Sequence, residues 1–111
     1  GSAHVFVQSG EEWMRRAKLL TPDGASYDNF GQSVAIYHDT IVVGAPFDFD
    51  SILCSGSAHA FFWNGEKWSH QAKLLVPNSA EDDYVGSSLW FGDSVAIFGD
   101  TIVVGDRSDD D

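Results

Sequence analysis

The chain has 111 residues and a formal net charge of −11, from 17 acidic and 6 basic residues, which argues against nucleic-acid binding because phosphate contacts need a basic face. A hydrophobic content of 43% and an aromatic content of 14% exclude a disordered chain, so we expect a folded core. The single cysteine, Cys54, excludes a disulfide within the chain, and no apolar stretch is long enough to insert into a membrane.

The chain is built on an internal repeat. Residues 1–31 return as residues 56–86 with 16 of 31 positions identical, at a shift of 55. Residues 30–50 return as residues 91–111 with 14 of 21 positions identical, at a shift of 61. The change of shift locates a six-residue insertion around 85–90, which we expect to lengthen a loop before a strand. Self-similarity of this kind is the sequence signature of a repeat architecture.

The first predicted hairpin joins strands at 3–8 and 13–20 through the turn Ser-Gly-Glu-Glu. Its copy joins strands at 58–63 and 68–75 through Asn-Gly-Glu-Lys. An Asn-Gly step between two such strands is a strong short-range hairpin signal, so the sequence predicts the same hairpin in both copies.

A second kind of hairpin is predicted from short, β-branched segments. Residues 33–37 and 40–44 are almost wholly apolar and are separated by only two residues. Their copies lie at 94–98 and 101–105, where Gly99 suits the positive φ that such a turn requires. Continuous apolar character predicts that both faces of these strands are covered.

Each repeat therefore predicts four short antiparallel strands. Two are apolar inner strands, a third follows, and the last is more polar. Four of the six basic residues fall on the last strands, and charge on an edge strand blocks unwanted pairing. These basic residues are Arg15, Arg16, Lys18 and Lys73. Buried inner strands with a charged outer strand are typical of a β-propeller blade.

The predicted fold class is all-β, with β-propeller blades of four antiparallel strands in two tandem repeats. Residues 1–31 are expected to form an outer half-blade plus a linker, and residues 32–75 one complete central blade. Residues 76–92 are expected to be a linker with the six-residue insertion. Residues 93–111 are expected to form an inner half-blade and an acidic tail.

The start and end of each inner hairpin resemble the FG-GAP repeat, the blade type of integrin α-subunit propellers. The motif reads Phe-Gly at 30–31 and Gly-Ala-Pro at 44–46. In the second copy it reads Phe-Gly at 91–92 and Gly-Asp-Arg at 105–107, so the last part is degraded. The segment that begins Gly-Ser-Ala resembles bacterial, secreted members. The resemblance implies a β-propeller that is extracellular or at the cell surface and is used for adhesion or ligand binding.

Many FG-GAP proteins bind calcium in an Asp-rich loop between the two inner strands. That position holds only two residues in each copy here, so the family's calcium site does not carry over. An acidic loop follows the inner hairpin instead, and clustered carboxylates are ligands that calcium accepts. The candidate ligands are Asp48, Asp50, Asp109 and Asp111. A solvated acidic loop without metal is the alternative.

Two repeats do not close a propeller, because propellers have roughly four to eight blades. The predicted strands at 3–8 and 101–105 each leave an edge that another strand must cover. Copies of the chain could pair head to tail into a ring or filament, or further blades of the same polypeptide could cover the edges. The residues assigned to this assembly edge are Ala3, His4, Val5, Phe6, Val7, Thr101, Ile102, Val103, Val104 and Gly105.

The sequence carries no pattern of catalytic residues, since it has neither a nucleophile elbow nor a phosphate-binding loop. We therefore expect no enzyme. His4 and His59 are equivalent and are predicted to be packed or hydrogen-bonded. Trp63 and Trp90 occur only in the second copy, near loop acids, and aromatic rings in that setting suit the faces of sugars. The alternatives to a scaffold are thus a lectin-like propeller that binds glycans or cell-surface proteins, or a propeller segment of a larger secreted protein.

Overall fold

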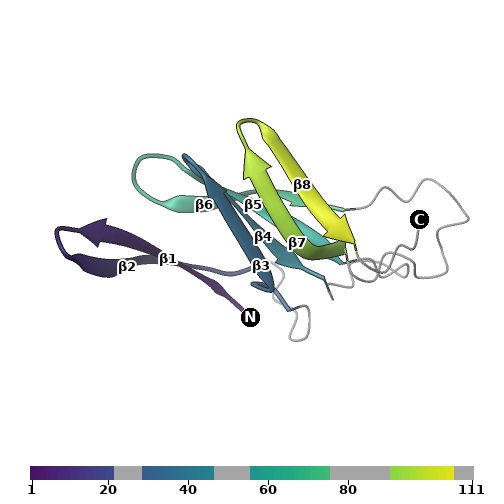
Figure 1. The fold of residues 1–111 in the computed structure, drawn as a ribbon, viewed down its shortest axis with the longest axis horizontal. Coiled ribbons are helices and arrows are strands. Elements are labelled where there is room, and N and C mark those ends of the chain that lie inside the picture. Colours follow the sequence, from purple (N-terminus) through teal and green to yellow (C-terminus); the bar gives the residue numbers. More distant parts are fainter. Residues whose placement is uncertain (22–28, 47–55, 76–90, 107–111) are drawn as a thin grey trace, which may run out of the picture.

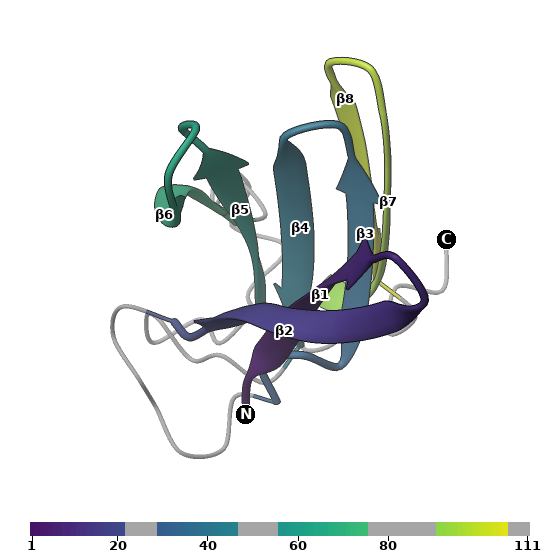
Figure 2. The ribbon, with the colours of Figure 1, turned by 90° about the vertical axis from the view of Figure 1, so that its left-hand side faces the viewer.

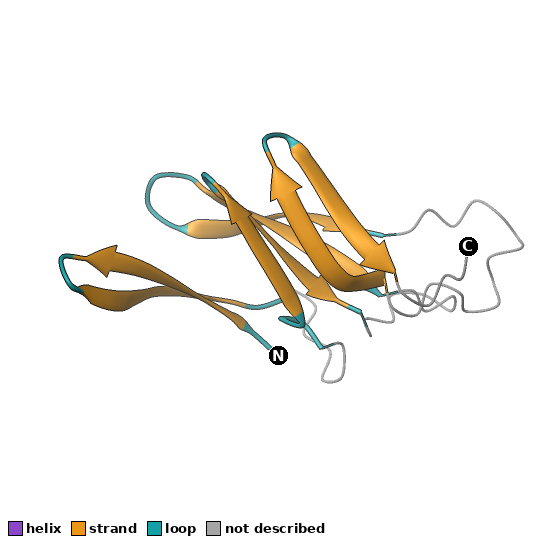
Figure 3. Cartoon of the chain, viewed as in Figure 1, coloured by secondary structure: helices purple, strands orange, loops and turns teal. Residues whose placement is uncertain are grey.

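A computed structural model describes residues 1–21, 29–46, 56–75 and 91–106. Every regular element in these ranges is a β-strand, which confirms the all-β class (Figure 3). The strands are β1 (Ala3–Ser9), β2 (Glu12–Leu19), β3 (Ser33–Tyr37), β4 (Thr40–Ala45), β5 (Ser57–Trp63), β6 (Trp68–Leu74), β7 (Phe91–Phe98) and β8 (Thr101–Asp106). Most ends lie within one residue of the predicted ones. β7 instead begins at Phe91 and carries a register shift before Ser94.

The described strands form three antiparallel sheets. The central sheet has the order β3-β4-β5-β6, and β1-β2 and β7-β8 form two-stranded sheets on either side of it (Figure 1). The arrangement is consistent with one complete blade between two partial blades. In Figure 2, β1 and β2 cross in front of β3 and β4, while β7 and β8 lie behind β3. The three sheets therefore stack side by side along the longest dimension of the molecule.

The tight turns of the two inner hairpins have the backbone conformation that the sequence predicts. Gly99 begins the β7–β8 turn with a φ of +61°, which glycine adopts without strain. His38 occupies the matching place between β3 and β4 and is held at a φ of +52°. Its ring lies edge-on to Tyr37, with the ring centroids 4.3 Å apart. The hairpin thus keeps the same turn in both copies, although only one copy has glycine there.

Replacing Asn64 by alanine is expected to destabilise the β5–β6 turn by about 1 kcal/mol. The Asn64 Oδ1 atom accepts hydrogen bonds from the backbone N–H groups of Glu66 at 2.8 Å and Lys67 at 3.0 Å. Chemical denaturation of the Asn64→Ala variant measures the loss. Ser9 holds the matching position in the β1–β2 turn, so Ser9→Ala is the control. A loss no larger than the control's would contradict the role of the Asn64 side chain.

The core lies between β4 and the sheets on either side. β4 is buried almost throughout, and one face of it joins Leu19, Phe30 and Phe61 in a single cluster through Ile41, Val43 and Ala45. Val42, on the other face of β4, is 0% exposed. Val5, Ala17 and Trp68 pack against this cluster from the neighbouring strands. The predicted coverage of both faces is therefore confirmed for β4.

The same prediction is wrong for β7 and β8, where Phe98 and Val103 are 77% and 62% exposed, and it is wrong for β3. Its residues alternate between half-buried and exposed, and Val34 and Ile36 are 56% and 59% exposed. Ala35 and Tyr37 point to the other side, where the Tyr37 ring lies 5.2 Å from that of Phe98. The reason is that β7 covers one face of β3, whereas no described strand lies flat against the other.

Candidate functional site

The joint between neighbouring blades is formed by backbone segments that approach closely at glycines. Gly92, with a φ of +99°, lies so near Ser57 that a methyl group on it would overlap the Ser57 carbonyl oxygen. A methyl group on Gly44 would overlap the Gly92 carbonyl oxygen, which also accepts a 3.1 Å hydrogen bond from Ser33 Oγ. The Phe-Gly step of one blade is thus inserted against the blade before it. Glycine is required there because no side chain fits.

The first copy repeats this close approach. Gly31 has a φ of +100°, and a methyl group on it would overlap the carbonyl oxygen of Ser2. A methyl group on Gly1 would likewise overlap the carbonyl oxygen of Phe30, and one on Gly56 would overlap the carbonyl oxygen of Phe91. In both copies, therefore, two backbone segments pack closely against each other. One is the Gly-Ser segment before a third strand, and the other is the Phe-Gly segment that begins the next blade.

A buried polar chain links the third and outer strands of the complete blade. His59 is 0% exposed, and its Nε2 atom lies 3.1 Å from Ser57 Oγ. The Nδ1 atom of His59 lies 2.9 Å from His70 Nε2. The ring of Phe30 meets the His59 ring edge-on, with centroids 5.5 Å apart. The predicted packed and hydrogen-bonded role of His59 is therefore what the structure shows.

The first copy has the same array with a cation in place of one imidazole. His4 Nε2 lies 3.1 Å from Ser2 Oγ, and Arg15 Nη1 lies 3.5 Å from His4 Nδ1. His4 is exposed, unlike His59. Arg15 thus holds the place that His70 holds in the second copy.

A β-bulge in each copy brings the histidine of the third strand and its partner on the outer strand to the same face. The β1–β2 register shifts after Val5, and the β5–β6 register shifts after Ala60. The shift puts His70 opposite Phe61, on the same face as His59. Without it, His70 would face the other way, because a slip of one residue reverses every side chain. This pairing of histidines was not predicted from the sequence. The spacing of 11 residues between the partners, which both copies share, is the signal that could have indicated it.

The predicted assembly edges lie on β1 and β8. In the described part of the chain, β1 pairs only with β2, and β8 pairs only with β7. Ala3 is buried, whereas Phe6, Val7 and Val103 are exposed. The remaining edge residues His4, Val5, Thr101, Ile102, Val104 and Gly105 lie on the same two strands. The structure leaves the two edges apart, at opposite ends of the stack of sheets (Figure 1).

Charge distinguishes these edges from the outer strands. β2 presents Arg15, Arg16 and Lys18 to solvent, and β6 carries Lys73. β1 has no Asp, Glu, Lys or Arg, and β8 has only Asp106, at its end. Charged edges resist further strand pairing and uncharged ones accept it. The edges of β1 and β8 are therefore chemically suited to pair with another strand.

The predicted sugar-binding tryptophans are only partly described. Trp63 stands beside Trp68, with ring centroids 5.6 Å apart, and the Arg16 guanidinium lies 6.0 Å from the Trp63 ring centroid. Trp90 lies outside the described residues. Trp13, the equivalent of Trp68 in the first copy, is 63% exposed, because β2 ends the stack of described strands. Sugar binding stays a prediction, which a glycan array with Trp63→Ala as the negative control would test.

The predicted metal ligands Asp48, Asp50, Asp109 and Asp111 lie outside the described residues. Within the described ranges, no group of three or more His, Cys, Asp or Glu side chains is placed to hold a metal ion. Those ranges also contain no helix of the length and apolar character needed to span a membrane.

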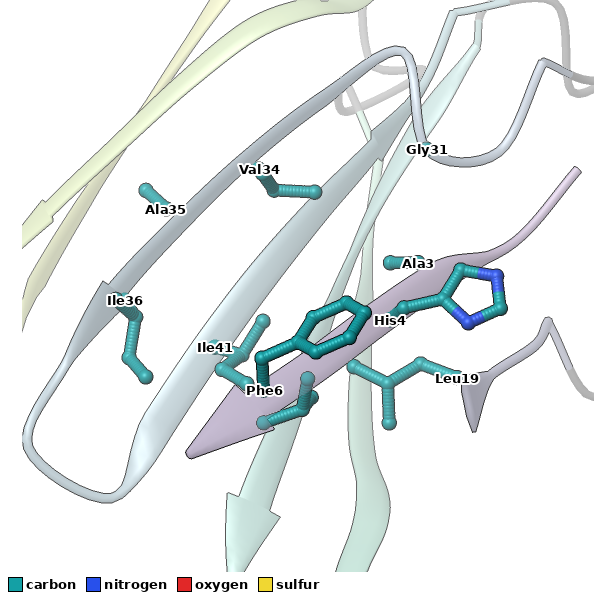
Figure 4. A pocket seen from close by; sticks show the side chains of 10 residues that line it. Ala3, His4, Phe6, Leu19, Gly31, Val34, Ala35, Ile36 and Ile41 are labelled. Atoms are coloured by element: carbon teal, nitrogen blue, oxygen red, sulfur yellow. The ribbon is translucent and has the colours of Figure 1, made fainter. Parts of the chain in front are cut away.

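A cavity of about 460 Å³ separates β1 from β3 and β4 (Figure 4). Its walls are mainly apolar. In Figure 4, Val34 and Ile36 project from one side of β3 and Ala35 from the other, and Phe6 projects from β1 nearby. The lining residues are Ala3, His4, Val5, Phe6, Leu19, Gly31, Val34, Ala35, Ile36 and Ile41. One wall thus contains the exposed face of β3, and the opposite wall belongs to an open-edged strand.

Comparison with models of protein families matches the FG-GAP repeat twice, over residues 13–61 and 68–111. A search of curated proteins finds no match. The two family matches begin at equivalent tryptophans and together cover most of the chain. Each match begins at an outer strand and continues through the inner hairpin of the following blade, and the first match also includes most of β5. The sequence repeat and the structural blade are therefore out of phase.

Proposed function

Because this chain belongs to the FG-GAP repeat family, we propose that it is a non-enzymatic β-propeller scaffold, extracellular or at the cell surface. Its role is adhesion or head-to-tail self-assembly into a ring or filament. The observation that carries the proposal is the pair of strand edges on β1 and β8, which are uncharged apart from Asp106 at the end of β8 and lie at opposite ends of the stack of sheets. An open strand edge is a template for main-chain hydrogen bonds with another polypeptide.

The position of the two edges determines what kind of assembly follows. They belong to different parts of the repeat, one to the third strand of a blade and the other to the second. A contact between unlike surfaces is heterologous, so it continues until a ring closes or a filament grows. Rings of about two to four copies would match the four to eight blades of known propellers. Further blades of the same polypeptide would cover the edges by the same pairing.

We expect the 111-residue chain to show a native mass several times its 12.1 kDa in light scattering. Open strand edges and exposed apolar side chains favour association over a bare monomer. Electron micrographs distinguish rings from filaments. A chain that stays at 12.1 kDa across a wide concentration range contradicts the proposal.

Light scattering with calcium and with a chelator tests whether the acidic loops bind calcium. The two-residue inner turns leave no room for the family's calcium loop, so we expect one mass in both conditions. A calcium-dependent mass would instead assign metal binding to Asp48, Asp50, Asp109 or Asp111.

A further inference from the structure

We propose that the cavity between β1 and β3–β4 is the docking site for the β7–β8 hairpin of a second copy of this chain. In this arrangement β8 of one copy pairs with β1 of the next and completes a four-stranded blade. The inference rests on the proposed self-association and deepens it, because it names the occupant, its register and the surface that it covers.

The β4–β5 pair within the chain provides the template for the register. β4 and β8 are equivalent strands at a shift of 61 residues, and β5 and β1 are equivalent at a shift of 55. In the template, Val42 pairs with Ala60 and Val43 with His59. Transferred to two copies, the expected pairs are Thr101 with Val7, Ile102 with Phe6, Val103 with Val5, Val104 with His4, and Gly105 with Ala3.

The faces of the inner hairpins also match. Inside the chain, β7 lies against the face of β3 that carries Ala35 and Tyr37. The equivalent of Tyr37 on β7 is Phe98, which is 77% exposed. The face of β3 that carries Val34 and Ile36 is exposed as well and lines the cavity. Stacking a second β7 there would repeat the internal packing and cover both exposed faces at once.

The occupant is a second copy because the described strands include a pair that matches the site. β1 and β2 correspond to β5 and β6 of the complete blade, and no described inner strands lie beside β1 as β3 and β4 lie beside β5. Among the described strands, β7 and β8 are the pair of that type without a third strand beside them. They match β3 and β4, which hold this position in the complete blade, through the 14-of-21 identity of the surrounding segment.

A glycine contact makes the proposal testable without disturbing the isolated chain. Gly44 touches the backbone of Gly92, the Phe-Gly glycine of the next blade. The equivalent of Gly44 is Gly105, and in the assembly it would touch Gly31 of the following copy. Within its own chain, a methyl group on Gly105 comes close only to Ser94 Oγ, a side-chain atom that can rotate away. Alanine at Gly105 therefore fits the single chain but overlaps backbone in the assembly.

Gly105→Ala is expected to weaken association by about a hundredfold or more in sedimentation, while the midpoint of chemical denaturation measured below the association range stays close to that of the parent. Gly99→Ala is the control, since a methyl group there meets nothing within 4 Å. It should associate as the parent chain does. Unchanged association of Gly105→Ala would overturn the docking geometry.

Cysteine cross-linking tests the register directly, in a Cys54→Ser background that removes the native thiol. Val5→Cys with Val103→Cys should form disulfide-linked multimers, because paired Cα atoms in antiparallel strands fall within disulfide range. Val7→Cys with Val103→Cys is the control, displaced by two residues on the same face of β1. Equal cross-linking of both pairs would overturn the register while leaving self-association standing. A parent chain that is monomeric throughout would instead overturn the proposed function and this inference together.

Discussion

Replacing Gly92 by alanine is expected to lower the free energy of unfolding by about 3 kcal/mol or more. Two costs add at this position. A φ of +99° is unfavourable for any residue with a Cβ atom, and the new methyl group would overlap the carbonyl oxygen of Ser57. Both groups in the overlap are fixed to the backbone, so no side chain can rotate to relieve it. The β7–β8 sheet must therefore move away from the complete blade or lose its packing.

Chemical denaturation followed by tryptophan fluorescence measures this loss. Gly99→Ala separates the two costs, because Gly99 has a φ of +61° and a methyl group added to it would meet nothing within 4 Å. It should lose only about 1–2 kcal/mol, the cost of the backbone conformation. Equal losses for Gly92→Ala and Gly99→Ala would show that the contact between the blades contributes nothing.

Replacing His59 by alanine is expected to cost about 3 kcal/mol or more of unfolding free energy. The His59 side chain is fully buried, so its removal leaves a cavity beside Phe30. It also removes a polar partner of Ser57 Oγ and of His70 Nε2. A cavity and a lost partner for a buried polar group are both among the larger causes of destabilisation.

The first copy offers the matched control in His4→Ala. His4 makes the equivalent contacts with Ser2 and Arg15 but is exposed, so its loss should cost less than about 1 kcal/mol in the dilute chain. Thermal or chemical unfolding of the two variants under one condition gives the comparison. Similar losses for the two variants would contradict the structural role assigned to burial of His59.

The strands and their turns could be predicted because their signals are local. The β5–β6 turn follows from one Asn-Gly step, whose side-chain acceptor is used by the backbone of the next residues. The inner hairpins follow from two β-branched segments separated by two residues. Next to each turn the antiparallel register also follows from the loop length, but the shifts after Val5 and Ala60 change the register further along the strands. His38 is an exception to the prediction of turns from residue type, because it has a positive φ although it is not glycine.

Of the candidate assembly site, only the two open strand edges could be predicted from the sequence. The sequence placed the assembly residues on β1 and β8, but it did not reveal the cavity beside β1 or the exposed face of β3. The nearly continuous apolar character of 33–37 predicts coverage on both sides, which the exposure of Val34 and Ile36 contradicts. Whether a second layer is present depends on the neighbouring sheets, and a strand's own composition does not report them.

By itself, the sequence determined the repeat, the eight strands and the blade type, because hydrophobic periodicity, turn residues and motif glycines act over a few neighbouring positions. Only the tertiary structure decided which segments meet. The contact of Gly44 with Gly92 joins residues from different blades, and the His59–His70 pair exists because a bulge turns His70 to the same face as His59. The physical reason is that a bulge or a stacked sheet changes the direction of side chains without changing the local pattern that forms the strand.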